Sequence, residues 1–108
     1  MFMVNKGVLN VKQLKIALDY DETYTADREF WRSFVALAKA HHHHVSFVTF
    51  RTHEIYDNNI DIFIDSKKCG IDIVYSSGKP KRSVFDADIW IDDSPATIEE
   101  YTLNYQNR

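Results

Sequence analysis

Four short apolar runs recur along the chain, separated by polar or amphipathic stretches. They lie at about residues 15–19, 45–49, 71–75 and 88–91. Continuous apolar runs of this length are typical of strands buried on both faces, as in parallel sheets. The pattern therefore predicts a mostly parallel sheet.

Between the first two runs, apolar side chains recur with the period of a helix. The pattern predicts a helix from about Asp27 to Ala40, with Asp27 as its N-cap. The apolar positions are Phe30, Trp31, Phe34, Val35, Leu37 and Ala38. A strand, a helix and a second strand in succession predict a right-handed parallel crossover.

Residues 53–68 fit two patterns. The alternation at residues 60–64 favours a strand, whereas Ile55, Ile62 and Phe63 could share one face of a helix. Gly70 would suit the position after a helix C-terminus. Because parallel strands need a crossover between them, we expect a helix here.

Prolines mark two later elements. Pro80 follows a Ser-Ser-Gly loop and opens a short helix, and Pro95 opens the last helix with Ser94 as its N-cap. Strand and helix thus alternate along the chain, which predicts an α/β fold with a mostly parallel sheet.

Composition narrows the class of protein. The chain has 108 residues, 44% hydrophobic and 14% aromatic, which suffices for one domain with its own core. Cys69 is the single cysteine, so no internal disulfide can form, and we expect a cytoplasmic protein. No apolar run approaches the roughly 20 residues that span a bilayer, and a net charge of −3 gives no general sign of nucleic-acid binding.

Polar side chains gather where the apolar runs end. Asp19 ends the first run, Thr49 the second and Asp92-Asp93 the fourth. Ligands bind at the carboxyl ends of strands in open parallel sheets, so these groups should meet there. Carboxylates brought together repel one another unless a cation lies among them, and an all-oxygen ligand set favours Mg²⁺. We therefore expect a phosphate to bind beside this cation.

These residues resemble the haloacid dehalogenase superfamily of phosphohydrolases. The matching order is a strand with Asp-x-Asp-x-Thr (Asp19, Asp21 and Thr23), a strand with Thr49, a lone lysine, and a strand with Asp-Asp. The resemblance covers about residues 15–95. It implies a three-layer, Rossmann-like single domain over residues 1–108, with an N-terminal extension at 1–14 and a core at 15–105.

The resemblance implies two-step phosphoryl transfer. Asp19 would be the nucleophile that forms an aspartyl-phosphate, and Asp21 would protonate the leaving group and then activate water. Thr49 and a lysine would hold the phosphate oxygens. We prefer Lys81 to Lys79 as that lysine, because a helix fixes an ammonium better than a loop does.

The same resemblance assigns a metal site and further substrate contacts. Mg²⁺ would be held by Asp19, by the backbone carbonyl of Asp21, and by Asp92 with Asp93 in support. The remaining substrate-binding candidates are Thr23, Thr49, Lys79 and Arg51. For Arg51 we favour the role of an ordinary surface arginine over a substrate contact.

The spacing leaves no room for a cap domain, so we expect an open site. Bulky substrates would then fit, such as a phosphoprotein, a nucleotide or a nucleic-acid end, unless a second copy of the chain closes the site. Two other functions remain open. One is a domain that binds phosphate or a partner without turnover, and the other is a receiver-type signalling domain. The latter is disfavoured because Ser76-Ser77, and no aspartate, follow the third run.

The run from His41 to His44 invites a metal-site interpretation, which we reject. It lies at the predicted end of a helix, where positive charge is mildly favoured. Consecutive residues of a helix point in different directions, so four in a row do not form one pocket. We expect a solvated helix end.

Overall fold

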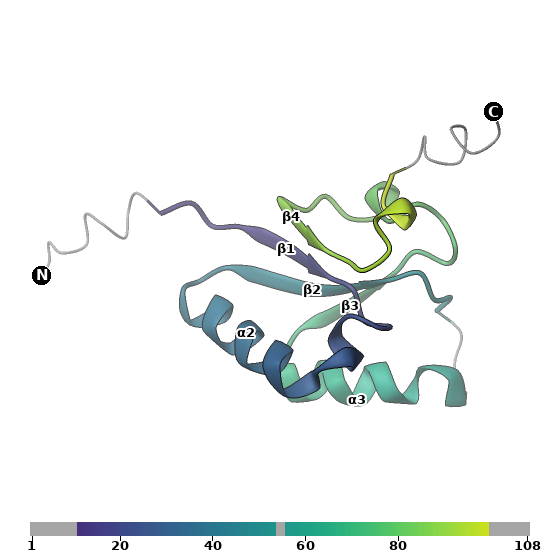
Figure 1. Ribbon diagram of the computed structural model, residues 1–108, viewed down its shortest axis with the longest axis horizontal. Helices are drawn as coiled ribbons and strands as arrows, with labels where there is room; N and C mark the ends of the chain where they lie inside the picture. Colours follow the sequence, from purple (N-terminus) through teal and green to yellow (C-terminus); the bar gives the residue numbers. More distant parts are fainter. Residues whose placement is uncertain (1–10, 54–55, 100–108) are drawn as a thin grey trace, which may run out of the picture.

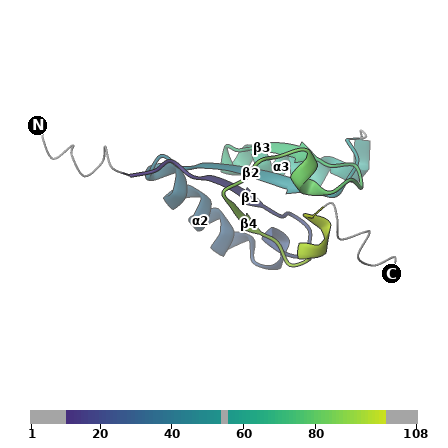
Figure 2. The same ribbon diagram turned by 90° about the horizontal axis from the view of Figure 1, so that it is seen from above.

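A four-stranded parallel sheet forms the centre of the molecule. The computed structural model describes residues 11–53 and 56–99. The strands are β1 (Lys15–Leu18), β2 (His44–Thr49), β3 (Asp72–Tyr75) and β4 (Ile89–Ile91), in the order β3-β2-β1-β4 (Figures 1 and 2). The predicted α/β fold with a parallel sheet is confirmed, and the described residues include no cap domain. Residues 1–10 of the expected N-terminal extension and residues 100–105 of the expected core lie outside the described residues, so these domain limits stay predictions.

Two helices cover one face of the sheet. They are α2 (Arg28–Ala40) and α3 (Ile60–Cys69), which contact each other below the sheet in Figure 1. Both crossovers run in the same direction across the sheet, so right-handed connections place both helices on the same face. The remaining helical elements are 3₁₀ turns: η1 (Tyr24–Ala26), η2 (Tyr56–Asn59), η3 (Lys81–Ser83) and η4 (Pro95–Thr97).

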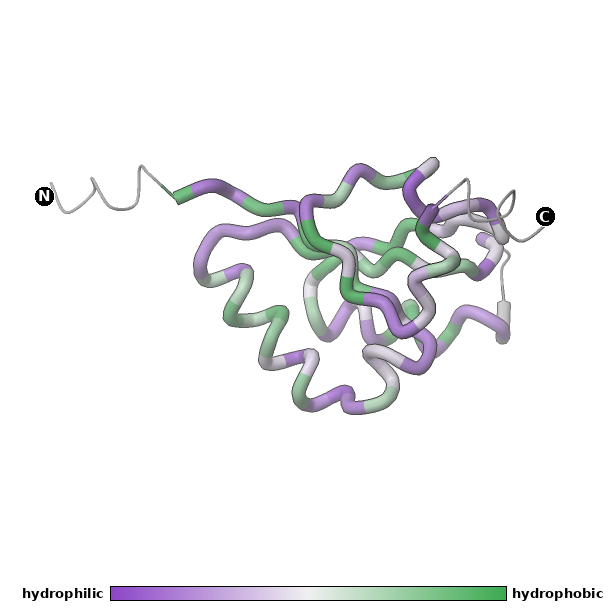
Figure 3. Tube along the Cα trace, turned by 45° about the horizontal axis from the view of Figure 1, so that its top comes forward, coloured by the Kyte–Doolittle hydropathy of each residue, from purple (hydrophilic) through white to green (hydrophobic). Residues whose placement is uncertain are grey.

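The opposite face of the sheet has a thin cover made by the chain between β3 and β4. Trp90 packs edge-on against Phe85, with ring centroids 6.3 Å apart, and the guanidinium of Arg82 lies 5.5 Å from the Trp90 ring. Because this long return crosses to the far edge of the sheet, it brings η3 over the ends of β1 and β4. The hydropathy colouring of Figure 3 shows apolar positions along the strands and polar positions in many of the connecting loops.

The helix ends follow the sequence with two corrections. Asp27 caps α2 as predicted, since its carboxylate accepts from the N–H of Phe30 at 3.1 Å. The middle segment is indeed helical, but α3 begins only at Ile60. The expected last helix is only the turn η4, and the Ser94 side chain makes no capping hydrogen bond. Ser94 nevertheless occupies the N-cap position and Pro95 opens the turn, as predicted, and the Asp92 carboxylate accepts from the N–H of Ser94 at 2.9 Å.

An aromatic cluster fixes the loop that follows β1. Tyr20 and Tyr24 are fully buried and stack at 5.6 Å, and both meet Phe47 edge-on. The hydroxyl of Tyr20 donates to buried Asp65 at 2.6 Å, and Arg28 completes the group with a 3.0 Å bond to the same carboxylate oxygen. Rigid rings on both sides of residues 21–23 hold that loop in one conformation.

No helix within residues 11–53 and 56–99 is both long and apolar enough to cross a membrane.

Gly70 ends α3 in the left-handed conformation, with φ +68°. A Cβ atom there would lie 2.6 Å from the Lys39 ammonium, which donates to the carbonyls of Cys69 and Gly70. We predict that Gly70→Ala lowers the free energy of unfolding by about 2 kcal/mol, since the left-handed conformation alone costs roughly 1–2 kcal/mol. Urea unfolding measures this, and an unchanged midpoint would contradict the predicted strain.

Candidate functional site

Three carboxylates meet where β1 and β4 end. The two strands pair in parallel with Leu18 opposite Ile91, so Asp19 comes to lie beside Asp92. The N–H of Asp19 donates to the carbonyl of Ile91 at 2.9 Å. One carboxylate oxygen from each of Asp19, Asp92 and Asp93 lies within 4.8 Å of the other two. Residues more than 70 positions apart thus form one acidic cluster, defined here as Asp19, Asp92 and Asp93.

A buried lysine joins two members of the acidic cluster. Lys81 is the first residue of η3, and only 2% of its surface is exposed. Its Nζ lies 2.7 Å from Asp19 Oδ1 and 2.7 Å from Asp92 Oδ2. Lys79, the other candidate, is exposed in the preceding loop. The structure therefore brings Lys81 to the cluster and leaves Lys79 outside it.

Thr23 connects the cluster from the side of the β1 loop. Its hydroxyl lies 2.9 Å from Asp19 Oδ2 and 3.1 Å from Asp93 Oδ1, and it accepts from the N–H of Asp93 at 3.1 Å. One hydroxyl proton can serve only one of the two carboxylates at a time. Thr23 was expected to contact substrate, and here its hydroxyl is engaged in holding two acidic loops together.

The charge balance of the cluster is negative. Burial raises the pKa of Asp19 to about 6, although the hydrogen bond and charge of Lys81 oppose that rise. The hydrogen bond with Asp19 lowers the pKa of Asp93, with Thr23 adding to the effect. One ammonium offsets only one of three carboxylates, so a divalent cation would be electrostatically favoured there.

Asp21 lies apart from this cluster, although it was expected to act beside Asp19. Its exposed carboxylate accepts from two nitrogens on one side of the Arg51 guanidinium, with Nη2 at 2.7 Å from Oδ1 and Nε at 3.0 Å from Oδ2. Among the described residues, its carboxylate is not part of the group that could share one ion. The resemblance implied that the backbone carbonyl of Asp21, and not its carboxylate, binds Mg²⁺, and this stays a prediction.

Arg51 is the centre of a second ionic group, which we call the arginine fork: Asp21, Arg51 and Asp61. The third guanidinium nitrogen, Nη1, lies 2.8 Å from Asp61 Oδ1. The Arg51 guanidinium carbon lies 5.2 Å from the Tyr20 ring centroid. Thr49, buried at the end of β2, accepts from the N–H of Arg51 at 3.2 Å. Arg51 is thus neither a solvated surface arginine nor free to bind phosphate in this conformation.

The sequence reasoning missed Asp61. Its role depends on where α3 begins, because Asp61 lies in the first turn of that helix. The Arg51 pair holds the pKa of Asp61 below its ordinary value. The alternating pattern of residues 60–64 obscured the helix start, and no spacing motif marks an acid that pairs with an arginine ten positions earlier.

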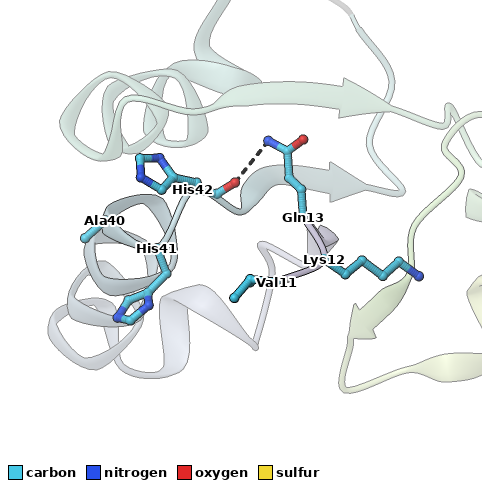
Figure 4. A pocket seen from close by; sticks show the side chains of 6 residues that line it. All are labelled: Val11, Lys12, Gln13, Ala40, His41 and His42. Atoms are coloured by element: carbon cyan, nitrogen blue, oxygen red, sulfur yellow. Dashed lines mark hydrogen bonds between the residues drawn. The ribbon is translucent and has the colours of Figure 1, made fainter. Parts of the chain in front are cut away.

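The histidine run lies at the amino ends of the strands, on the opposite side of the sheet from the acidic cluster. A pocket of about 280 Å³ is lined there by Val11, Lys12, Gln13, Ala40, His41 and His42. Figure 4 shows the His41 and His42 rings projecting in different directions, with Gln13 bonded to the His42 carbonyl. His43 accepts from the N–H of Leu14 at 3.0 Å. These contacts are structural and unrelated to the acidic cluster.

Comparison with known proteins found no match to this chain among family models, curated proteins or solved structures.

We predict that Lys81→Met lowers the free energy of unfolding by about 3 kcal/mol at pH 7. Removing one partner of a buried ion pair leaves uncompensated charge, which typically costs 3–5 kcal/mol. The loss should be smaller at pH 5, where the carboxylates bind protons more readily. Urea unfolding in the presence of a chelator measures both values.

Lys79→Met is the matched control, because it removes an exposed ammonium two residues away. Its effect should stay within about 0.5 kcal/mol, as for most surface substitutions. Equal effects of the two substitutions would contradict the role assigned to the buried ammonium.

Asp19 also makes stability depend on pH. Its folded pKa of about 6 lies above the ordinary value of 3.8, so the stability that its proton contributes is complete below pH 3.8 and is lost as the pH rises through 6. Asp19→Asn has no such proton to lose. We predict that the metal-free variant gains stability relative to wild type over this interval, by up to about 3 kcal/mol. Parallel unfolding curves at pH 4 and pH 7 test this, and a constant difference would contradict it.

Proposed function

We propose that this protein is a Mg²⁺-dependent phosphatase of the haloacid dehalogenase type, which acts on phosphomonoesters through an aspartyl-phosphate on Asp19. The observation that carries this proposal is the convergence of Asp19, Lys81, Asp92 and Asp93 at the carboxyl end of a parallel sheet. Their chain order and their positions after strands match the superfamily pattern described above.

The donor set fits magnesium. Asp19, Asp92 and Asp93 offer only carboxylate oxygens, which are the ligands that a hard cation prefers. These three residues would hold the ion, with the Asp21 carbonyl as a further ligand. When bound, Mg²⁺ would offset the repulsion between the anionic nucleophile and an anionic phosphate.

Side chains of the protein would act as the nucleophile, as the acid and base, and as the contacts to the phosphate. A carboxylate oxygen of Asp19 would attack phosphorus while the bond from phosphorus to the leaving oxygen breaks. Asp21, protonated from solvent once it has left Arg51, would give that proton to the leaving oxygen, and would later take one from the water that hydrolyses the aspartyl-phosphate. Lys81 and Thr49 would stabilise the phosphate oxygens, where charge spreads in the transition state.

This chemistry requires one rearrangement. The Asp21 carboxylate is bound to Arg51 in the structure and lies away from the acidic cluster. We infer that the side chain rotates toward the leaving oxygen when substrate binds. Apo geometry often shows catalytic groups away from their reacting positions, so this separation does not exclude the role.

One observation also supports a second candidate, a domain that binds phosphate or a partner without turnover. The ammonium of Lys81 bonds Asp19 and Asp92 together, which partly neutralises the cluster without a metal. A closed ion pair of this kind can serve stability alone. Homo-oligomerisation and action on nucleic-acid ends remain predictions, since neither the fold nor the site bears on them.

We predict that the purified protein hydrolyses a generic aryl phosphate when Mg²⁺ is present and loses this activity with a chelator. Asp19→Asn should reduce kcat by at least about a thousandfold, because an amide cannot form the covalent intermediate. Circular dichroism should show an intact fold.

Asp86→Asn is the matched control, since Asp86 is an exposed acid outside the cluster, and it should retain wild-type turnover. Wild-type activity in Asp19→Asn would reject the mechanism. Binding of Mg²⁺ by calorimetry without turnover of any phosphomonoester would support the non-catalytic domain.

A further inference from the structure

Asp65 is a buried carboxylate that the proposed reaction does not use. It lies in α3, and only 5% of its surface is exposed. Its Oδ2 accepts from the Tyr20 hydroxyl at 2.6 Å and from Arg28 Nε at 3.0 Å. Arg28 Nη2 also donates to the Tyr20 hydroxyl oxygen at 3.2 Å, so the three side chains close a ring of hydrogen bonds. Because a buried ion pair often adds little net stability, stability alone is a weak reason for this carboxylate.

Tyr20 connects this carboxylate to the reacting groups. It stands in the chain between Asp19 and Asp21, the proposed nucleophile and the proposed acid. Its side chain is fully buried, with the ring stacked on Tyr24 at 5.6 Å and edge-on to Phe47 at 5.2 Å. A shift of this side chain would therefore move the backbone that carries both carboxylates.

The two neighbours of Tyr20 have opposite requirements in the proposed reaction. Asp19 is buried and must stay in line with phosphorus, whereas Asp21 is exposed and must leave Arg51 to reach the leaving oxygen. Movement of Asp21 leaves Asp19 in place only if the residue between them is fixed. Displacement of a reacting atom by about 1 Å can cost roughly a hundredfold in rate, so fixing Tyr20 matters for turnover.

The hydroxyl of Tyr20 supplies the directional part of this anchor. Apolar contacts are non-directional, so the packed rings alone would permit small sliding movements. A hydrogen bond to a carboxylate is short, strong and directional. Asp65 belongs to a helix and is itself held by the guanidinium of Arg28, so it offers an acceptor at a fixed place.

We propose that Asp65 is a positioning residue for phosphoryl transfer, which acts through the Tyr20 hydroxyl to keep the nucleophile Asp19 in place. This inference rests on the proposed phosphatase function. It assigns a role in turnover to a residue of α3 that lies outside the acidic cluster. The alternative is a purely structural tie between α3 and the loop after β1.

The test begins with Tyr20→Phe, which removes the hydroxyl and keeps the ring. With an aryl phosphate and Mg²⁺, the variant should lower kcat at least about tenfold and leave KM within about twofold of wild type. The reason is that the contacts to the phosphate remain while the nucleophile loses its fixed position. Turnover is measured at a temperature where urea titration shows both proteins to be fully folded.

Tyr24→Phe is the matched control. Tyr24 is equally buried and belongs to the same stack, but its hydroxyl makes only 3.4 Å contacts, with Cys69 and with Arg32. Its loss should leave kcat within about twofold of wild type, because no carboxylate anchors this ring through its hydroxyl.

A double-mutant cycle separates positioning from stability. Asp65→Leu should lower kcat as much as Tyr20→Phe does, and the double variant should lower it no further, since both changes break the same bond. Asp65→Leu alone leaves the buried Tyr20 hydroxyl without its acceptor, and the second change removes that hydroxyl. The double variant should therefore recover part of the urea midpoint that Asp65→Leu loses, with no recovery of kcat.

Wild-type kcat in Tyr20→Phe, with turnover present in the wild type, would overturn the positioning role and leave the phosphatase function standing. Recovery of kcat together with the urea midpoint in the double variant would also overturn it, because the losses would then follow stability alone. Absence of aryl phosphate turnover in the wild type would reject the phosphatase function itself, and the positioning role with it.

Discussion

The site depends on one buried ammonium shared by two carboxylates. Lys81 carries its charge into a place where only 2% of the residue is exposed, and the 2.7 Å contacts to Asp19 and Asp92 compensate that burial. The ion pairs also tie three separate parts of the chain together: the end of β1, the end of β4 and the turn η3. Without the ammonium, the poorly solvated carboxylates of Asp19 and Asp92 would face each other with no cation between them, which is strongly unfavourable.

The acids at this end of the sheet divide between two cations. Lys81 serves the acidic cluster, whose remaining negative charge suits a divalent ion, and Arg51 serves Asp21 and Asp61 in the arginine fork. Tyr20, which separates Asp19 from Asp21 along the chain, is buried and stacked in the aromatic cluster, with Arg51 beside its ring. This partition keeps the Asp21 carboxylate apart from the acidic cluster, so the proposed reaction requires Asp21 to leave Arg51.

Burial has opposite consequences for stability and for chemistry at Asp19. Desolvation raises its pKa to about 6, so the metal-free fold loses stability when the carboxyl ionises near neutral pH. The same poorly solvated carboxylate would attack phosphorus more readily than a hydrated one, and a bound cation would restore the favourable balance. Because ionisation of Asp19 lowers the stability of the metal-free fold, its burial is better explained by a function than by structural support.

Local pattern was enough to predict the parallel strands, the Asp27 cap, the Gly70 helix end and the acids at the ends of β1 and β4, because these follow from periodicity, burial and turn chemistry along short stretches. The pattern did not predict the start of α3, the turn in place of a last helix or the pairing of Asp61 with Arg51, because the spacing of apolar and polar residues carries no signal for them. The choice between Lys79 and Lys81 was also decided in three dimensions, since only the fold determines which ammonium is buried between two carboxylates. Pairing of charges across the sheet is a property of tertiary contacts, and sequence spacing does not encode it.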